Sequence, residues 1–188
     1  MTGPLSGVRV VELAGIGPAP FAVMLLADMG ASVVRVDRAG PASGDYAPNP
    51  VMERGRRSIA VNLKDPAGAD VVRRLVARAD VFVQSLRAGV VGELGVDFAG
   101  ATALNPRIVY CNITAFGTRG PLADRPGYDP LMQAYGGLMS INGHPGAEPA
   151  RVGTSPDARY PIAWYATHIS AVSNSAVVTS TARPVASR

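Results

Sequence analysis

The region that most restricts the fold lies between residues 8 and 37, where a strand, a turn, a helix and a second strand follow one another. Residues 8–13 (VRVVEL) and 32–37 (SVVRVD) have the nearly continuous apolar character of strands buried in a parallel sheet. Between them, residues 21–29 (FAVMLLADM) predict a short apolar helix that ends at Gly30. Two strands joined by a helix form a βαβ unit with a right-handed crossover. This region therefore predicts an α/β fold.

The alternation of strands and helices continues along the chain. Asp65 followed by Pro66 marks the start of one helix, because aspartate caps a first turn and proline fits the first helical position. Further strands are predicted at residues 58–63, 80–84 and 107–112, and further helices at 66–79, 87–94 and 131–139. This order predicts a Rossmann-like, largely parallel sheet with flanking helices.

The character of the sequence changes after about residue 155. Residues 170–188 are rich in Ser, Ala and Thr and show neither a helical apolar stripe nor a clear strand alternation. We therefore expect one Rossmann-like domain over residues 1–155 and an atypical, poorly ordered tail over residues 156–188.

The composition disfavours some classes of binding partner. The net charge of +4 is mild, and only 6% of the 188 residues are aromatic, which leaves few side chains to stack on bases and disfavours a nucleic-acid partner. No segment has the roughly 20 apolar residues of a membrane span, and no signal pattern begins the chain. The single Cys111 fits a reducing compartment. We expect a cytoplasmic protein that binds neither membrane nor nucleic acid.

The turn after the first predicted strand is the first candidate site. Gly15 and Gly17 match two glycines of the dinucleotide fingerprint, and Asp37 stands where an acid that binds a ribose is expected. Pro20, however, replaces the third glycine, and Pro18 and Pro20 have no N–H to offer a pyrophosphate. A nicotinamide or flavin cofactor is therefore disfavoured, while a tight connection without any ligand stays an alternative. No permanently bound cofactor and no metal is expected.

Longer segments carry a resemblance to a known family. They are PLSGVRVVELAGIGPAPFAVMLLADMGASVVRVDR, RGRRSIAVNLKDPAG, ADVFVQSLRAGVVGELGV and LNPRIVYCNITAFGTRGPLADRPGYDPLMQAYGGLMSINGHPG. In this order, from about residue 4 to about residue 153, the chain resembles the class III coenzyme A transferases of the CaiB/BaiF type. That family includes formyl-CoA and carnitine-CoA transferases and the α-methylacyl-CoA racemases. The resemblance implies a Rossmann-like fold and coenzyme A or an acyl-CoA as substrate.

The resemblance also implies a site for the nucleotide end of coenzyme A. Arg38 can pair with the 3′-phosphate or stack on adenine, since a guanidinium does both. Val61 and Lys64 match family positions that line the adenosine-phosphate site, where Lys64 would act as a point charge on phosphate.

Other implied contacts follow the pantetheine arm. Gly17 and Pro18 lie where the family's backbone passes this arm. Ser85 and Leu86 replace an Asn-Phe pair that is common in the family, which weakens the assignment of that contact. Glu93 falls where some members have Arg, so one possible phosphate partner is missing.

The family motif PGYD appears as residues 126–129 and implies catalytic roles for Tyr128 and Asp129. Racemases of the family tend to carry histidine in place of this tyrosine, because a base near neutral pH must take and return an α-proton. Tyr128 therefore favours transfer over racemisation. His144 and His168 stand elsewhere, and His144 is interpreted as a turn residue.

Transferases of the family use an aspartate that attacks the thioester and later carries CoA as an aspartyl thioester. The candidate here is Asp157, shortly after Arg151-Val152-Gly153. The residues after Asp157 (ARYPIAWYATHIS) depart from the family, which leaves a loop carboxylate as the alternative.

Family members are much longer than this chain and form homodimers of interlocked subunits. The resemblance thus implies the N-terminal part of an incomplete large domain, and a truncated or frameshifted product is an expectation. The leading hypothesis is a CoA transferase that acts on an acyl-CoA and a carboxylic acid acceptor. The alternatives are an α-methylacyl-CoA racemase and a non-catalytic CoA-binding fragment.

Overall fold

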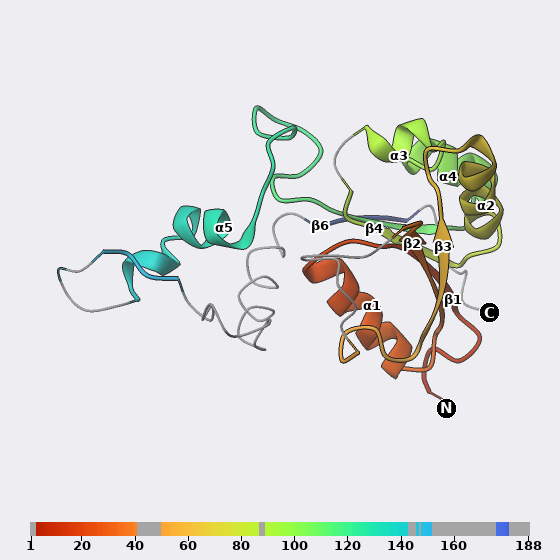
Figure 1. Ribbon diagram of the computed structural model, residues 1–188, viewed down its shortest axis with the longest axis horizontal. Coiled ribbons are helices and arrows are strands. Elements are labelled where there is room, and N and C mark those ends of the chain that lie inside the picture. The colour runs from red at the N-terminus through yellow and green to blue at the C-terminus, as the bar shows by residue number, and fades with distance from the viewer. Residues whose placement is uncertain are drawn as a thin grey trace, which may run out of the picture. The chain divides into compact units, whose positions relative to one another are not determined.

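The computed structural model describes residues 3–40, 50–86, 89–142, 146 and 148–151, together with the backbone of residues 176–180. The chain divides into two compact units (Figure 1). The first unit contains the chain up to Ile113 and takes in Val177 and the residues after it, whereas the second runs from Thr114 to Ala176.

A parallel sheet forms the centre of the first unit. Its strands are β1 (Arg9–Leu13), β2 (Ser32–Arg38), β3 (Arg56–Val61), β4 (Val81–Gln84), β5 (Val109–Ile113) and β6 (Ala176–Ser180). They lie in the order β3-β2-β1-β4-β5-β6, and the pairs from β3 to β5 are all parallel. This is the Rossmann strand order, so the predicted α/β fold with a largely parallel sheet is confirmed.

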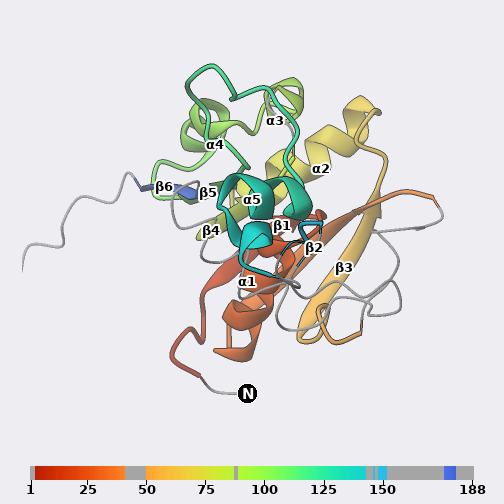
Figure 2. The same ribbon diagram turned by 90° about the vertical axis from the view of Figure 1, so that its left-hand side faces the viewer.

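Helices cover both faces of this sheet, as the two views agree (Figures 1 and 2). One face carries α1 (Pro18–Asp28), and the other carries α2 (Pro66–Val76), α3 (Val90–Glu93) and α4 (Phe98–Leu104). Because side chains alternate along a strand, β1 supplies Val10 to the α1 face and Val11 to the opposite one. Val11 belongs to the main core cluster together with Phe82 and Val72 of α2.

Two local signals in the sequence work as expected. The side chain of Asp65 accepts a hydrogen bond from the N–H of Ala67 and caps α2, which begins at Pro66. Gly30 follows the end of α1 with a φ of 97°, a conformation that glycine adopts without a steric cost.

Several boundaries and elements differ from the sequence predictions. Helix α1 begins at Pro18 rather than at residue 21, because the fixed φ of proline suits the first turn of a helix. The N–H groups of the first turn have no acceptor within the helix, so the N–H that proline lacks costs no hydrogen bond there. The helix expected at residues 66–79 ends at Val76. Within the predicted helix 87–94, the described helical part is α3.

Two further elements were not predicted at all. Helix α4 is rich in Ala and Gly and has no marked apolar stripe, but Asp97 caps it and its Phe98 packs edge-on against Tyr110 of β5. Strand β6 lies within the stretch where we expected no strand. Tertiary packing stabilises α4 where its local pattern is weak.

The second unit contains one short α-helix and one 3-10 turn among its described residues. Helix α5 comprises Asp129–Tyr135, and η2 comprises Leu138–Ser140. The predicted helix at 131–139 is interrupted because Gly137 adopts a left-handed φ of 74°. The rings of Phe116 and Tyr135 pack edge to face within this unit. None of the helices in the described part of the chain is long and apolar enough to span a lipid bilayer.

Candidate functional site

The direction of the strand connections reverses between β1 and β4, and we call the space beyond the carboxyl ends of these two strands the crevice. The chain leaves β1 towards β2 on one side, whereas β4 lies on the other side of β1. In open α/β sheets, ligands bind at this reversal, beyond the carboxyl ends of the strands. We call that side of the sheet the carboxyl edge. The turns after β1 (residues 14–17) and after β4 (residues 85–86) border the crevice.

The two turns are in close contact at Gly15 and Ser85. A β-carbon placed on Gly15 would approach the Oγ atom of Ser85 to less than 3.0 Å, a distance that real β-carbons essentially never show. The backbone of Gly15 is not in the left-handed region, so the neighbour and not the local conformation requires glycine here. The Oγ atom of Ser85 is buried and has no hydrogen-bond partner among the residues that the structure describes. A buried polar atom thus lies beside the β1 turn, at the carboxyl ends of β1 and β4.

Gly17 and Pro18 make the turn from β1 into α1. Gly17 caps α1 with φ 76° and ψ −126°, a conformation that favours glycine, and provides no side-chain cap. Pro18 and Pro20 both lie in the first helical turn and have no N–H group. The start of α1 is therefore poorly equipped to bind a pyrophosphate in the manner of a dinucleotide fold, which agrees with the sequence interpretation.

Asp37 cannot readily take the role of a ribose-binding acid. Its Oδ1 atom accepts a hydrogen bond of 2.8 Å from Arg35, and its Oδ2 atom accepts one of 2.6 Å from the hydroxyl of Ser58. Both carboxylate oxygens are therefore already engaged, one by a residue of the same strand, β2, and the other by a residue of β3. This arrangement also argues against a nicotinamide cofactor.

A charged cluster lies on the α1 face of the sheet, next to Asp37. Arg35 also pairs with Glu53 at 3.0 Å, and Arg56 of β3 pairs with Glu12 of β1 at 2.5 Å. The side chains of Glu12 and Arg56 are only 0% and 2% exposed. Burial raises the pKa of the Glu12 carboxyl, although the nearby positive charge of Arg56 opposes this effect. The cluster joins three neighbouring strands beneath the candidate site.

Arg38 and Val61 lie side by side where β2 and β3 end. They are partners in the strand register, and the N–H of Ala39 donates a 3.1 Å hydrogen bond to the carbonyl of Val61. Val61 is buried, whereas Arg38 is exposed. Lys64 is exposed in the turn that leads to α2, where its N–H donates to Oδ1 of Asn62. The structure therefore brings all three predicted nucleotide contacts to the carboxyl edge.

The turn after β4 depends on a residue that the sequence analysis did not assign to the site. The buried side chain of Gln84 accepts a 2.8 Å hydrogen bond from the N–H of Leu86. Its amide nitrogen donates to Oδ1 of Asn112 at 2.6 Å and lies 3.4 Å from the hydroxyl of Tyr110. Burial raises the pKa of Tyr110 to about 12, so this hydroxyl stays protonated at neutral pH. The signal in the sequence that could have indicated a role for Gln84 is its position as the single polar residue at the end of the apolar strand β4.

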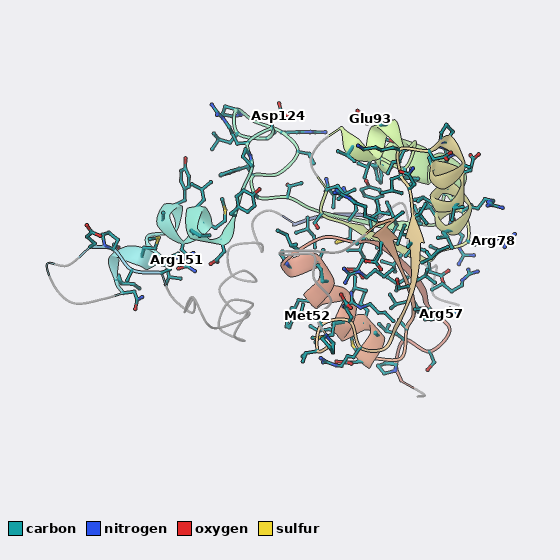
Figure 3. All side chains as sticks on the ribbon, in the orientation of Figure 1. Met52, Arg57, Arg78, Glu93, Asp124 and Arg151 are labelled. Carbon is teal, nitrogen blue, oxygen red and sulfur yellow. The ribbon has the colours of Figure 1, made fainter. Side chains whose placement is uncertain are left out.

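Glu93 occupies an exposed position on α3 (Figure 3). Figure 3 also shows Arg78 on the outer side of the molecule, beyond the end of α2. A basic residue of this kind, distant from the carboxyl edge, is a useful control for the charges at Arg38 and Lys64.

The predicted catalytic residues Tyr128 and Asp129 are neighbours at the start of α5. Tyr128 is 54% exposed. Asp129 is buried, and its Oδ2 atom accepts a 2.7 Å hydrogen bond from Nε2 of Gln133. Gly127 has no room for a β-carbon because Ala115 lies against it. This packing fixes the backbone just before the two residues.

Asp157, the candidate nucleophile, lies outside the described residues, as do His144 and His168. Within the described part of the chain, no group of three or more His, Cys, Asp or Glu side chains is arranged to hold a metal ion.

Comparison with known proteins identifies the family. Residues 5–172 match the model of CoA-transferase family III. The chain is 40% identical over 172 residues to succinate–glutarate CoA-transferase from Agrobacterium fabrum, covering 81% of this chain and 42% of that protein. It is 41% identical over 145 residues to the α-methylacyl-CoA racemase of Mus musculus, covering 77% of this chain and 37% of the racemase.

A solved structure supports the same relationship. The crystal structure of a CaiB/BaiF family protein from Brucella suis superimposes with a TM-score of 0.73 at 37% identity, covering 82% of this chain and 44% of that one. This chain thus spans less than half the length of these relatives. The residues that match the family model include strands β1 to β5 and the turns after β1 and β4, and the chain belongs to CoA-transferase family III.

Proposed function

We propose that this chain supplies the coenzyme A site of an enzyme that transfers CoA from an acyl-CoA thioester to a carboxylic acid. The observation that carries the proposal is the carboxyl edge itself, where Arg38, Val61 and Lys64 lie on one side of the crevice and Ser85 lies at its base. The relatives named as CoA-transferases support the same substrate class.

The charges suit the nucleotide end of coenzyme A. The guanidinium of Arg38 can form two parallel hydrogen bonds to the 3′-phosphate or stack on the adenine, and the Lys64 ammonium can neutralise a phosphate from the adjacent turn. Val61 lies between these two residues in the sequence and is buried, and it would form an apolar wall of the nucleotide site. The prolines that begin α1 leave the pyrophosphate to side chains rather than to a helix N-terminus.

The proposed reaction proceeds through Asp157. Its carboxylate attacks the thioester carbonyl, CoA leaves as the thiolate, and a mixed anhydride forms. The thiolate then attacks the aspartyl carbonyl, which releases the donor acid and leaves CoA on Asp157 as a thioester. The acceptor carboxylate repeats these two steps in reverse order and leaves as the new acyl-CoA. Atoms and charges balance without any further reactant.

Tyr128 favours transfer over racemisation in this proposal. A phenol is a poor base near neutral pH, so it is unsuited to removing an α-proton from an acyl-CoA. Racemisation is the second candidate because the mouse racemase is 41% identical to this chain over 145 residues. Deuterium exchange at the α-carbon of an acyl-CoA, without any acceptor acid, would favour the racemase.

Calorimetric titration of the folded chain with CoA and, separately, with NAD tests the binding site. We expect saturable heat with CoA and none with NAD, and the opposite result would refute the proposal. A thioester exchange assay on the same material tests turnover. We expect the 188-residue chain to bind CoA without turnover, because the relatives that it matches are more than twice as long. Robust exchange would refute that expectation.

A further inference from the structure

The side chain of Gln84 forms three polar contacts although it is almost completely buried. Gln84 is the last residue of β4 and is 1% exposed. Its Oε1 atom accepts from the N–H of Leu86, and its Nε2 atom donates to Asn112 and faces Tyr110. A buried amide is costly unless its donor and acceptor are both satisfied, and this one satisfies both.

These contacts fix which way round the amide lies. A backbone N–H can only donate, so the atom that faces Leu86 must be the oxygen, and the nitrogen must then face β5. Asn112 is the register partner of Gln84 on β5. The side chain of Gln84 therefore links the exit of β4 to the neighbouring strand in one defined orientation.

The turn that Gln84 holds has little freedom to move. Ser85 lies between the two hydrogen-bonded residues, and its Oγ atom occupies the space beside Gly15 where a β-carbon would clash. Leu86 packs against the main core cluster. A shift of this turn would move Ser85 against the β1 turn or withdraw it from the crevice.

We propose that Gln84 is a positioning residue for coenzyme A, acting through the turn at Ser85 and Leu86; this inference rests on the proposed CoA site. Gln84 does not touch the ligand. It supplies the acceptor that holds the N–H of Leu86, and it thereby keeps Ser85 against Gly15 at the base of the crevice.

The test compares two substitutions of the same residue. Gln84→Leu keeps the bulk but removes the acceptor for Leu86, and we expect CoA affinity to fall by about tenfold or more, as for loss of a buried hydrogen bond. Gln84→Glu keeps that acceptor, and burial favours the neutral carboxyl, whose O–H can donate to Oδ1 of Asn112 in place of the amide. We expect Gln84→Glu to bind CoA within about threefold of the wild-type chain.

Asn105, which follows α4 and precedes β5, offers a matched control. Its Oδ1 atom accepts from the N–H of Arg107 and its Nδ2 atom donates to the carbonyl of Ala79, so it also holds a turn. It lies before β5, at the edge opposite the crevice. We expect Asn105→Leu to lower the thermal midpoint and leave the CoA affinity unchanged. Amide exchange at Leu86 should accelerate in Gln84→Leu and not in Asn105→Leu.

The outcomes separate this inference from the proposed function. Absence of CoA binding by the wild-type chain would refute the proposed function. Equal CoA affinity in wild type and Gln84→Leu, or a loss in Gln84→Glu as large as in Gln84→Leu, would refute only the positioning role. If Gln84→Leu does not fold, Asn112→Leu decides instead, because without its Nε2 partner the Gln84 amide is no longer held in the orientation that presents Oε1 to Leu86. Unchanged CoA affinity in Asn112→Leu would overturn the inference.

Discussion

A β-carbon on Gly15 would overlap the Oγ atom of Ser85, so the turns that follow β1 and β4 are in contact at the carboxyl edge of the sheet. This relationship joins residues that are far apart in the sequence and places a buried hydroxyl at the base of the candidate CoA crevice.

We expect Gly15→Ala to lower both stability and CoA affinity. The added methyl forces Ser85 out of its place, and overpacking of this kind costs about 1–3 kcal/mol. The double variant Gly15→Ala with Ser85→Ala should recover the stability, because the nearest remaining atom is the β-carbon of residue 85 at 3.7 Å. Denaturant unfolding and calorimetry with CoA measure the two effects. No difference between the single and double variants would contradict the contact.

Substitution of two other glycines, Gly68 and Gly92, by alanine should change the free energy of unfolding in opposite directions. A β-carbon on Gly68 would clash with the backbone carbonyl of Asn62, whereas one on Gly92 would meet no atom of the described residues within 4 Å. We expect Gly68→Ala to destabilise the chain because a backbone atom cannot turn aside. Gly92→Ala should stabilise it by about 0.4–1 kcal/mol, through the smaller entropy of the unfolded chain. Urea unfolding of both variants measures this, and equal effects would contradict the packing around α2.

Arg38 should determine whether the protein distinguishes CoA from 3′-dephospho-CoA. A charged hydrogen bond contributes about 1.5–3 kcal/mol, so we expect Arg38→Ala to weaken CoA binding by roughly ten- to a hundredfold. Binding of 3′-dephospho-CoA should change much less. Arg78→Ala is the control, since Arg78 is exposed beyond the end of α2. Equal losses for both ligands would show that Arg38 does not bind the 3′-phosphate, and calorimetry at constant ionic strength makes the comparison.

The buried pair of Glu12 and Arg56 should make stability depend on pH. Removing one partner of a buried ion pair costs about 3–5 kcal/mol, so we expect Arg56→Met to be strongly destabilising. Glu12→Gln combined with Arg56→Met should recover most of this loss, because neither charge then remains buried without a partner. Urea unfolding of the two variants gives the comparison, and a double variant as unstable as Arg56→Met would contradict it.

The direction of the pH effect follows from the raised pKa of Glu12. Below the unfolded-state value of 4.5 both states bind the proton, and the stability contribution is fully present. As the pH rises through the higher folded-state pKa, the folded protein must lose a proton from a buried site, and stability falls. We expect this fall in the wild-type chain and not in the double variant. Unfolding curves between pH 4 and pH 8, compared at equal ionic strength, would contradict the assignment if they were parallel.

Much of the fold followed from local patterns. The apolar runs at β1 and β2 and the short helix between them predict a parallel sheet, because periodicity and connection length depend only on neighbouring residues. The helix cap at Asp65 and the helix end at Gly30 were also predictable from the sequence, since each depends on residues within one turn of the chain. The order of the motifs also indicated the family, which the family model confirms over residues 5–172.

The site required the tertiary structure. In the sequence, Gly15 suggests only a turn. Glycine is required at this position because Ser85 lies against it, and only the pairing of β1 with β4 brings Ser85 near. Asp37 resembles a ribose-binding acid in the sequence, yet Arg35 and Ser58 occupy both its oxygens. The roles predicted for Arg38, Lys64, Tyr128, Asp129 and Asp157 stay predictions.

The sequence by itself thus determined the order of the strands and helices from β1 to β5 apart from α4, because each of those elements is specified by residues close together in the chain. Only the tertiary structure decided which side chains meet, as with Gln84, whose orientation depends on Leu86 and Asn112 together. Strand register sets such contacts, and register is a property of the whole sheet rather than of any one strand.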